Sequence, residues 1–189
     1  MQKLFLIRHG KPAAVWGEAD EDPGLDDAGR AQAEAARDHL LSLPEDQRPR
    51  RVVSSPLRRC RETAAPTAEA HGVEVEIDPG VGEIPTPAAL TAEQRPAWLR
   101  EAFQGRWSEI QGDLDYEDWR RRAAGSLLAR GRTAVFSHYV AINAVMSLLA
   151  EDERVLVFRP DHASITTLAT DGQNLVLVEA GREASTGVL

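Results

Sequence analysis

The chain has 189 residues, of which 42% are hydrophobic and 28% are charged. This composition is ordinary for one folded domain and excludes disorder as the main state. The 22 Lys and Arg residues against 30 Asp and Glu residues give a formal net charge of -8. A chain of this charge lacks the overall positive field that attracts proteins to phosphate backbones, so we expect no nucleic acid partner.

Cysteine usage and hydropathy indicate the compartment. Cys60 is the only cysteine of the sequence, which excludes an internal disulfide and a thiolate zinc cluster and is typical of a reducing compartment. The apolar run 4–7 meets Arg8 directly, too early for a signal peptide, and no later run approaches the length of a membrane span. We therefore expect a cytoplasmic protein with no metal, no cofactor and no membrane partner. The sequence does not indicate an oligomeric state.

Strands and helices alternate in the first part of the chain. A short continuous apolar run ending at Arg8 and His9 is typical of a buried parallel strand. An Ala-rich segment follows the N-cap candidates Asp26 and Asp27 and stops at Pro44, which predicts a helix. In chain order, the predicted elements are a strand at 3–7, a helix at 28–43, a strand at 51–54, a helix at 57–70 closed by His71 and Gly72, and a half-exposed strand at 73–77.

Residues 84–130 break this alternation. We expect one domain over residues 1–189, with 84–130 forming a helical insert or lid. Its aromatic residues are interpreted as packing and its arginines as exposed charge, although an arginine near a phosphate pocket leaves a recognition role open. The aromatic residues are Trp98, Phe103, Trp107, Tyr116 and Trp119, and arginines stand among them at 95, 100, 106, 120, 121 and 122.

The alternation returns after this insert. Residues 133–138 predict a strand and residues 140–150 a helix, and the runs 164–170 and 175–178 flank a turn at 171–174 that favours a hairpin. Repeated strand and helix alternation with an antiparallel end predicts an α/β fold. We expect a three-layer α/β/α sandwich with a mostly parallel central sheet and an antiparallel strand near the C-terminus.

Polar groups follow three of the predicted strands. They are Arg8 and His9 after the first, the serines 54–55 with two arginines at 58–59 after the second, and Ser137 with His138 after the fourth. The carboxyl ends of parallel strands converge, and ligands bind there in open α/β sheets. Guanidinium groups offer paired donors to phosphate oxygens, and a neutral imidazole nitrogen can attack phosphorus. This set of groups favours a phosphoryl site without a metal.

Three segments in this order make the sequence recognisable. The runs 6–10 (LIRHG), 25–33 (LDDAGRAQA) and 54–64 (SSPLRRCRETA) resemble the histidine phosphatase superfamily, also called the phosphoglycerate mutase-like family. The resemblance continues through Glu83, Ser137-His138 and the run 164–166, so it covers nearly the whole chain apart from the insert. Each short motif is weak by itself, whereas the ordered set is specific.

The resemblance implies a role for each matching residue. His9 is the nucleophile that becomes phosphorylated, and Arg8 and Arg59 hold the phosphoryl oxygens. The family pattern selects Arg59 rather than its neighbour Arg58, which is expected to point elsewhere.

Two further roles follow from the same resemblance. His138 is the second histidine and contributes a hydrogen bond or charge to the transferring phosphoryl group. Glu83 occupies the place of the acid, which protonates the leaving alkoxide and then activates water.

The sequence departs from the family pattern around these motifs. Pro12 stands where the family usually has Thr, and an Asn expected downstream as a phosphate contact is absent, with Trp16 and Gly17 nearby instead. Tyr139 follows Ser137-His138 where the family usually has Gly. Its bulk narrows the pocket or its phenol contacts substrate, so Tyr139 is a candidate substrate-binding residue.

The remaining histidines and the cysteine receive no role. His39 and His71 are ordinary helix residues, Cys60 is expected to be a small buried side chain, and a substrate contact by His162, in a predicted loop, is the less favoured interpretation.

The favoured function is a metal-independent phosphatase that hydrolyses a small phosphomonoester through a phosphohistidine on His9 and releases inorganic phosphate. A phosphoglycerate mutase-like phosphotransferase is an alternative, disfavoured because mutases of the family are typically longer, with extra segments that shield the phosphoenzyme. A second alternative is a catalytically weak module that binds a phosphorylated ligand. Tyr139 and the absence of the family's usual Thr and Asn motivate this alternative. The sequence does not identify the substrate.

Overall fold

The computed structural model describes residues 1–14 and 22–185. In these residues the strands form one sheet in the order β3-β2-β4-β1-β5-β6. The first four of these strands run parallel, whereas β5 pairs antiparallel with β1 and β6 antiparallel with β5. The strand bounds are β1 (Gln2–Arg8), β2 (Arg51–Ser54), β3 (Val75–Ile77), β4 (Thr133–Ser137), β5 (Ile165–Thr170) and β6 (Leu175–Glu179).

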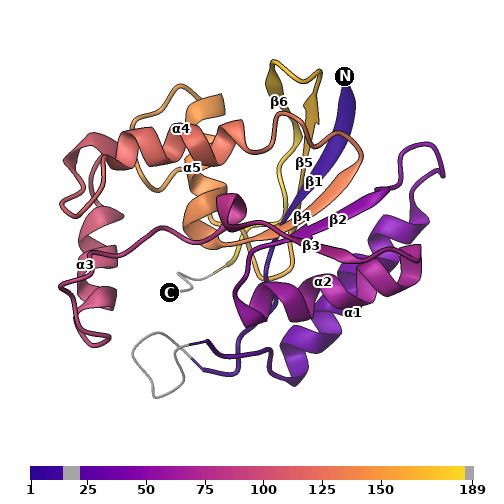
Figure 1. Cartoon of the computed structure of the whole chain (residues 1–189), viewed down its shortest axis with the longest axis horizontal. Coiled ribbons are helices and arrows are strands. Elements are labelled where there is room, and N and C mark those ends of the chain that lie inside the picture. The colour runs from indigo at the N-terminus through magenta and orange to yellow at the C-terminus, as the bar shows by residue number, and fades with distance from the viewer. Residues whose placement is uncertain (15–21, 186–189) are drawn as a thin grey trace.

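The sheet is covered on both faces, which confirms the predicted three-layer α/β/α sandwich (Figure 1). Side chains of β1 alternate between the faces. Leu4 and Leu6 pack in one apolar cluster with helix α5 (Tyr139–Leu149), and Phe5 and Ile7 pack in the other with helices α1 (Asp27–Ser42) and α2 (Arg58–His71). Burial on both faces explains why β1 is a continuous apolar run.

The helix ends follow the sequence signals. The Asp26 side chain accepts a hydrogen bond from the Gly29 amide, which confirms Asp26 as the N-cap of α1. Gly72 ends α2 in the left-handed conformation, with φ of 65°. The predicted strand at 73–77 starts two residues late because the Val73 amide donates to Ala68 O at 3.0 Å and so completes the end of α2.

The C-terminal half also matches its prediction. His138 is the N-cap of α5, so β4 ends at Ser137 rather than at 138. The β5-β6 hairpin turns at Gly172, with φ of 93°, and Asp171 accepts hydrogen bonds from the amides of Gln173 and Asn174. This is the expected turn between antiparallel strands.

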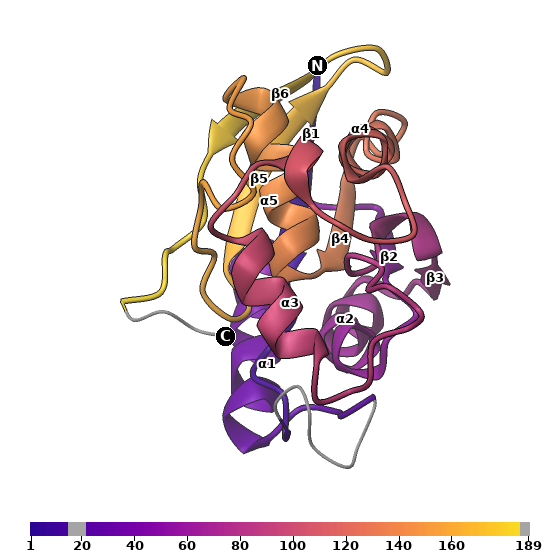
Figure 2. The same ribbon diagram turned by 90° about the vertical axis from the view of Figure 1, so that its left-hand side faces the viewer.

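The 84–130 segment contains α3 (Arg95–Ala102), the short 3-10 helix η2 (Trp107–Glu109) and α4 (Tyr116–Gly125), and η1 (Pro79–Val81) precedes it. Trp107 is buried, packs against Trp119, and donates from its indole to the Ser147 hydroxyl of α5 at 3.0 Å. Figures 1 and 2 show α3 standing apart from the sheet beside α5. The tryptophans of this segment therefore act in packing, as expected. No helix among the described residues is long and apolar enough to cross a membrane.

Candidate active site

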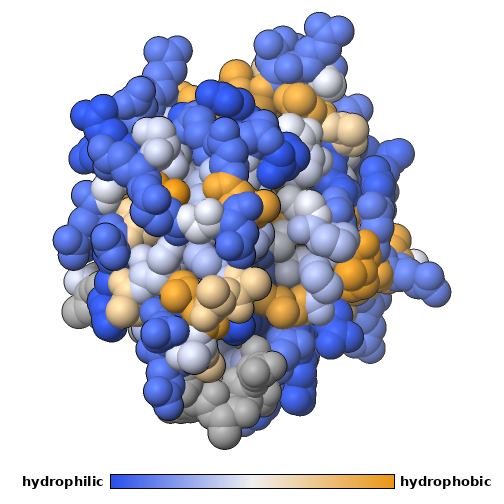
Figure 3. All heavy atoms as spheres, turned by 60° about the vertical axis from the view of Figure 1, so that its left-hand side comes forward, coloured by the Kyte–Doolittle hydropathy of each residue, from blue (hydrophilic) through white to orange (hydrophobic). Residues whose placement is uncertain are grey.

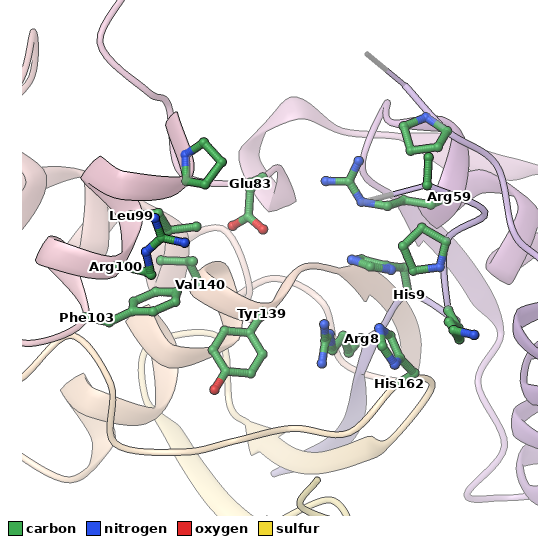
Figure 4. A pocket seen from close by; sticks show the side chains of 15 residues that line it. Arg8, His9, Arg59, Glu83, Leu99, Arg100, Phe103, Tyr139, Val140 and His162 are labelled. Atoms are coloured by element: carbon green, nitrogen blue, oxygen red, sulfur yellow. The ribbon is translucent and has the colours of Figure 1, made fainter. Parts of the chain in front are cut away.

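A cavity of about 420 Å3 opens where the carboxyl end of β1 faces α3 (Figure 4). Five of the six predicted site residues line it, namely Arg8, His9, Arg59, Glu83 and Tyr139. The sixth, His138, does not line the cavity. It is fully buried, and its ring centroid lies 5.4 Å from that of His9. The other lining residues are Lys11, Pro12, Ala14, Pro23, Pro96, Leu99, Arg100, Phe103, Val140 and His162.

The sheet register brings the predicted residues together. Arg8 at the end of β1 pairs with Ser137 at the end of β4. The His9 amide donates to Ser137 O at 3.0 Å, and the Ser55 amide beyond β2 donates to Phe136 O at 3.0 Å. Residues far apart in the sequence therefore leave neighbouring strands at one edge, as the parallel arrangement predicts.

His9 is held as a neutral imidazole with one free nitrogen. Its Nδ1 lies 2.8 Å from Gly10 O, and because a carbonyl only accepts, Nδ1 carries the proton. Burial lowers the pKa of His9 well below its usual range, and His138, Arg59 and Arg8 lower it further. The unprotonated Nε2 is therefore available as a nucleophile at neutral pH.

Gly10 fixes the backbone beside this imidazole. Its amide donates to Thr63 Oγ1 of α2 at 2.9 Å, and Thr63 Oγ1 donates to Arg59 O at 2.6 Å. A Cβ at Gly10 would lie 2.6 Å from Gly29 O, so a side chain does not fit there. The close approach of α1 therefore explains the glycine that follows His9.

Arg8 is oriented by a carbonyl and an aromatic face. Its Nη1 donates to Pro160 O at 2.9 Å, and its Cζ lies 4.9 Å from the centroid of the Tyr139 ring. Arg8 Nε is buried and has no hydrogen-bond partner in the described part of the chain. Burial lowers the pKa of Arg8 to about 10, so the guanidinium keeps its charge at neutral pH.

Arg59 and His138 form a buried pair. Arg59 Nη2 lies 3.2 Å from His138 Nδ1, and because a guanidinium only donates, Nδ1 accepts. His138 Nε2 then carries the proton and donates to the Ser55 hydroxyl at 2.7 Å. Burial lowers the pKa of His138 well below its usual range, and the positive charges of Arg59 and Arg8 lower this pKa further.

The neighbours of Arg59 on α2 differ from it as expected. Arg58 is more exposed than Arg59 and donates from Nε to Glu62 Oε1 at 2.7 Å, outside the cavity lining. Cys60 is fully buried and its Sγ donates to Ser137 O at 3.3 Å. Burial raises the pKa of the Cys60 thiol, which keeps it protonated and unreactive.

Glu83 supplies the carboxyl group of the cavity. Its Oε2 lies 3.8 Å from His138 Nδ1, and its Oε1 accepts from the Ile84 amide at 3.0 Å. Burial raises the pKa of Glu83 above its usual range, although the charge of Arg59 opposes this shift. A carboxyl group with a raised pKa is suited to donate and accept a proton near neutral pH.

Two lining residues carry chemistry that sequence reasoning did not assign. His162 lies with its ring centroid 5.9 Å from that of His9, and burial, aided by Arg8, lowers the pKa of His162 to about 4. Arg100 projects from α3. The sequence places His162 in a predicted loop, where a substrate contact is the less favoured interpretation. Arg100 is one of seven arginines in the 84–130 segment, and no motif distinguishes it from the others. Four residues were noted where the sequence departs from the family pattern. Pro12 and Tyr139 line the cavity, whereas Trp16 and Gly17 lie outside the described residues.

The cavity therefore combines a neutral imidazole, the guanidinium groups of Arg8, Arg59 and Arg100, and a buried carboxyl group. Within residues 1–14 and 22–185, no cluster of three or more His, Cys, Asp or Glu side chains is arranged to hold a metal ion. Arg8 and Arg59 match the charge of a dianionic phosphoryl group, and an imidazole and a carboxyl group lie in the same cavity. The arrangement is suited to phosphoryl transfer.

This fold and this site define a family. Residues 4–182 match the profile of the histidine phosphatase superfamily (branch 1), and the chain belongs to this superfamily. The match extends through the ordered motifs that suggested it, from β1 to the residues after β6.

Two of the curated relatives are named for different activities. A "Probable phosphatase" of Schizosaccharomyces pombe is 40% identical over 72 residues, which is 35% of this chain and 32% of the relative. A "Probable phosphoglycerate mutase" of Yersinia enterocolitica is 27% identical over 164 residues, covering 79% of this chain and 75% of that one. The chain thus spans only about a third of the length of the first relative.

Solved structures share the fold. A mycobacterial glucosyl-3-phosphoglycerate phosphatase superposes with a TM-score of 0.72 at 22% identity, covering 97% of this chain and all of the other. A phosphoserine phosphatase of Entamoeba histolytica, in complex with 3-phosphoglyceric acid, gives 0.72 at 24% identity, covering 96% and 98%. At this identity the likeness establishes the fold alone.

Proposed function

We propose that the protein is a metal-independent phosphatase that hydrolyses a small phosphomonoester through a phosphohistidine on His9. The observation that carries this proposal is the state of His9, a neutral imidazole whose Nδ1 proton is bound by Gly10 O and whose Nε2 faces a cavity between two arginines. The names of the phosphatase relatives and of structures that share the fold support the reaction class.

The first half-reaction transfers the phosphoryl group to the enzyme. His9 Nε2 attacks phosphorus, and the bond from phosphorus to the leaving oxygen breaks. Arg8 and Arg59 donate to the phosphoryl oxygens as negative charge gathers on them. Glu83, whose pKa is raised by burial, gives its proton to the leaving alkoxide and becomes a carboxylate.

The second half-reaction restores the enzyme. The Glu83 carboxylate takes a proton from water, the water oxygen attacks phosphorus, and the bond from phosphorus to Nε2 breaks. Phosphate leaves, His9 is again neutral and Glu83 is again protonated. His138 stays neutral in both steps and orients Arg59 through the hydrogen bond to its Nη2.

Turnover of 4-nitrophenyl phosphate in excess chelator tests this proposal. We expect metal-free turnover that is lost in His9→Ala. Arg59→Gln and Arg58→Gln remove the same charge from adjacent positions, and we expect the first to lower kcat/KM by roughly 10²–10³ and the second by less than about threefold. Equal losses in the two variants, or activity that depends on added metal, would contradict the proposal. Phosphate binding without turnover would instead identify a binding module.

One observation favours a second candidate. The Yersinia enterocolitica relative, whose alignment covers 79% of this chain, is named a probable phosphoglycerate mutase. A mutase returns the phosphoryl group from His9 to another hydroxyl of the product rather than to water. Phosphorus NMR of the products from 3-phosphoglycerate separates the two, because a mutase yields an isomeric ester and a phosphatase yields free phosphate.

A further inference from the structure

The wall of the cavity that faces the reaction centre is built from one side of α3. Pro96, Leu99, Arg100 and Phe103 all line the cavity. Their spacing of i, i+3, i+4 and i+7 places them on one face of the helix. In Figure 4 Leu99, Arg100 and Phe103 lie across the cavity from His9 and Arg59. A leaving group attached to phosphorus at His9 therefore extends toward this face of α3.

Most of this wall is apolar. Pro96, Leu99, Phe103 and Val140 have no polar side-chain atom, and the Phe103 ring lies 5.8 Å from that of Tyr139. On the face where the 84–130 segment comes forward, Figure 3 shows hydrophobic patches set among hydrophilic residues. Hydroxyl groups of a leaving group placed against these four side chains would give up hydrogen bonds to water without gaining any from the side chains, which is unfavourable. An apolar leaving group loses nothing and buries apolar surface.

Arg100 is the charged exception on this wall. Among the described residues, Arg100 makes no hydrogen bond or ion pair, whereas Lys11 on the facing side is paired with Asp26 at 2.9 Å. The charge of a phosphoryl dianion is already matched by Arg8 and Arg59. A third, unpaired cation in the same cavity therefore fits a second negative group on the ligand.

We infer that the cavity selects phosphomonoesters whose leaving group has an apolar body and carries an anionic substituent bound by Arg100. This inference rests on the proposed function and specifies its substrate class. The α3 face sets the distance between the two anionic groups, with the phosphoryl group at Arg8 and Arg59 and the second anion at Arg100.

Binding of phosphonates tests the inference separately from catalysis, because phosphonates are not hydrolysed. Calorimetry with the wild-type protein compares phenylphosphonate, 4-carboxyphenylphosphonate and 2,3-dihydroxypropylphosphonate. We expect the carboxylate to tighten binding by about tenfold over phenylphosphonate. We expect the dihydroxypropyl compound to bind more weakly than either aromatic one.

Variants then assign the effect to one side chain. Arg100→Gln is expected to remove most of the tenfold advantage of the carboxylate, and Arg100→Glu to reverse it. Arg121→Gln removes an exposed arginine from α4 outside the cavity lining and should keep the advantage. Thermal unfolding of each variant confirms that it is folded.

Three results would overturn the inference: no advantage of the carboxylate in the wild type, an advantage that survives Arg100→Gln, or equally tight binding of the dihydroxypropyl compound. Absence of turnover with every phosphomonoester, together with the expected phosphonate ranking, would refute the phosphatase while leaving this binding preference in place.

Discussion

His9 and Glu83 owe their proposed reactivity to burial acting on opposite kinds of group. Burial disfavours charge, so it lowers the pKa of an imidazole and raises the pKa of a carboxyl group. Burial thus favours the neutral forms of both groups, which suits His9 to attack phosphorus and Glu83 to donate a proton. The arginines keep their charge because even the lowered pKa of Arg8, about 10, lies above neutrality.

The role of Glu83 predicts a dependence on the leaving group. Glu83→Gln keeps the size of the side chain but has no proton to transfer. We expect it to slow phosphorylation of His9 by roughly 10²–10⁴ with an alkyl phosphate and by much less with 4-nitrophenyl phosphate, whose leaving oxygen needs no proton. Rapid-quench measurement of the first turnover isolates this step. An equal loss with both esters would contradict the role as general acid.

Motifs predicted most of the individual residues of the site. The order of the runs around His9, Arg59 and His138 was sufficient because each follows a strand or begins a helix whose position the sheet fixes. His162 and Arg100 were beyond this reasoning. Their place in the cavity depends on how a loop and α3 fold back over β1, and no short pattern encodes that approach.

At the scale of elements, the start of α1 packs against the segment that carries His9. A Cβ at Gly29 would lie 2.1 Å from Lys11 O, and Lys11 O also accepts from the Asp26 amide at 3.1 Å. Gly10 meets Gly29 in the same contact. The position of His9 therefore depends on an interface between two backbones with no room for a methyl group.

This contact predicts the effect of one added methyl group. Gly29→Ala is expected to lower the free energy of unfolding by roughly 1–3 kcal/mol and to lower kcat/KM, because segment 10–12 must move. Gly125→Ala in α4 is the control, since a Cβ there meets nothing within 4 Å, and should be neutral or stabilising by roughly 0.5 kcal/mol. Chemical denaturation and steady-state kinetics measure both effects. Equal stability of the two variants would show that the contact at Lys11 relaxes freely.

Short sequence patterns predicted where the helices and strands lie more accurately than where they begin and end. The Asp26 cap and the Gly72 stop acted as predicted, whereas Val73 was assigned to a strand that starts only at Val75. Alternating Val and Glu residues indicate a strand, but they do not show that the first amide is already used by the preceding helix. Competition for one backbone donor thus decides the boundary.

At the scale of the whole molecule, several buried histidines make stability depend on pH. His9, His138 and His162 are all buried, and each has a lowered pKa. Above the usual histidine pKa of about 6.5, folded and unfolded chains are both neutral at these sites. As the pH falls below that value, only the unfolded chain takes up protons, so the free energy of unfolding decreases. Glu83 acts in the opposite sense, because its raised pKa contributes stability that is present in acid and is lost as the pH rises through that pKa.

His162 offers a defined window for measuring this effect. Between the ordinary value of 6.5 and about 4, the unfolded chain binds a proton at His162 that the folded chain does not. His162→Gln should therefore flatten the fall in the free energy of unfolding across this window by up to about 1.4 kcal/mol per pH unit. His39→Gln, on the exposed side of α1, controls for loss of an imidazole. Urea unfolding at several pH values makes the comparison, and identical slopes for wild type and His162→Gln would contradict it.

The layered architecture was predicted from alternation alone because both faces of the sheet are buried and the helices between strands have clear ends. The position of the helices in the 84–130 segment was not predicted, since they pack through scattered aromatic residues such as Trp107 and Trp119 rather than through a regular pattern. This segment supplies the α3 wall of the cavity, so the least predictable part of the fold carries the proposed selectivity.

The covalent intermediate is the most direct test of the proposed mechanism. Wild type, His9→Ala and Glu83→Gln are incubated with 4-nitrophenyl phosphate and chelator, quenched in base, and examined by peptide mass spectrometry. We predict one phosphoryl group on His9, stable in base and lost in acid, more abundant in Glu83→Gln where hydrolysis is slowed, and absent from His9→Ala. Two results would contradict the proposed mechanism. One is turnover by the wild type while neither the wild type nor Glu83→Gln carries a phosphoryl group on His9, and the other is a phosphoryl group on a different residue.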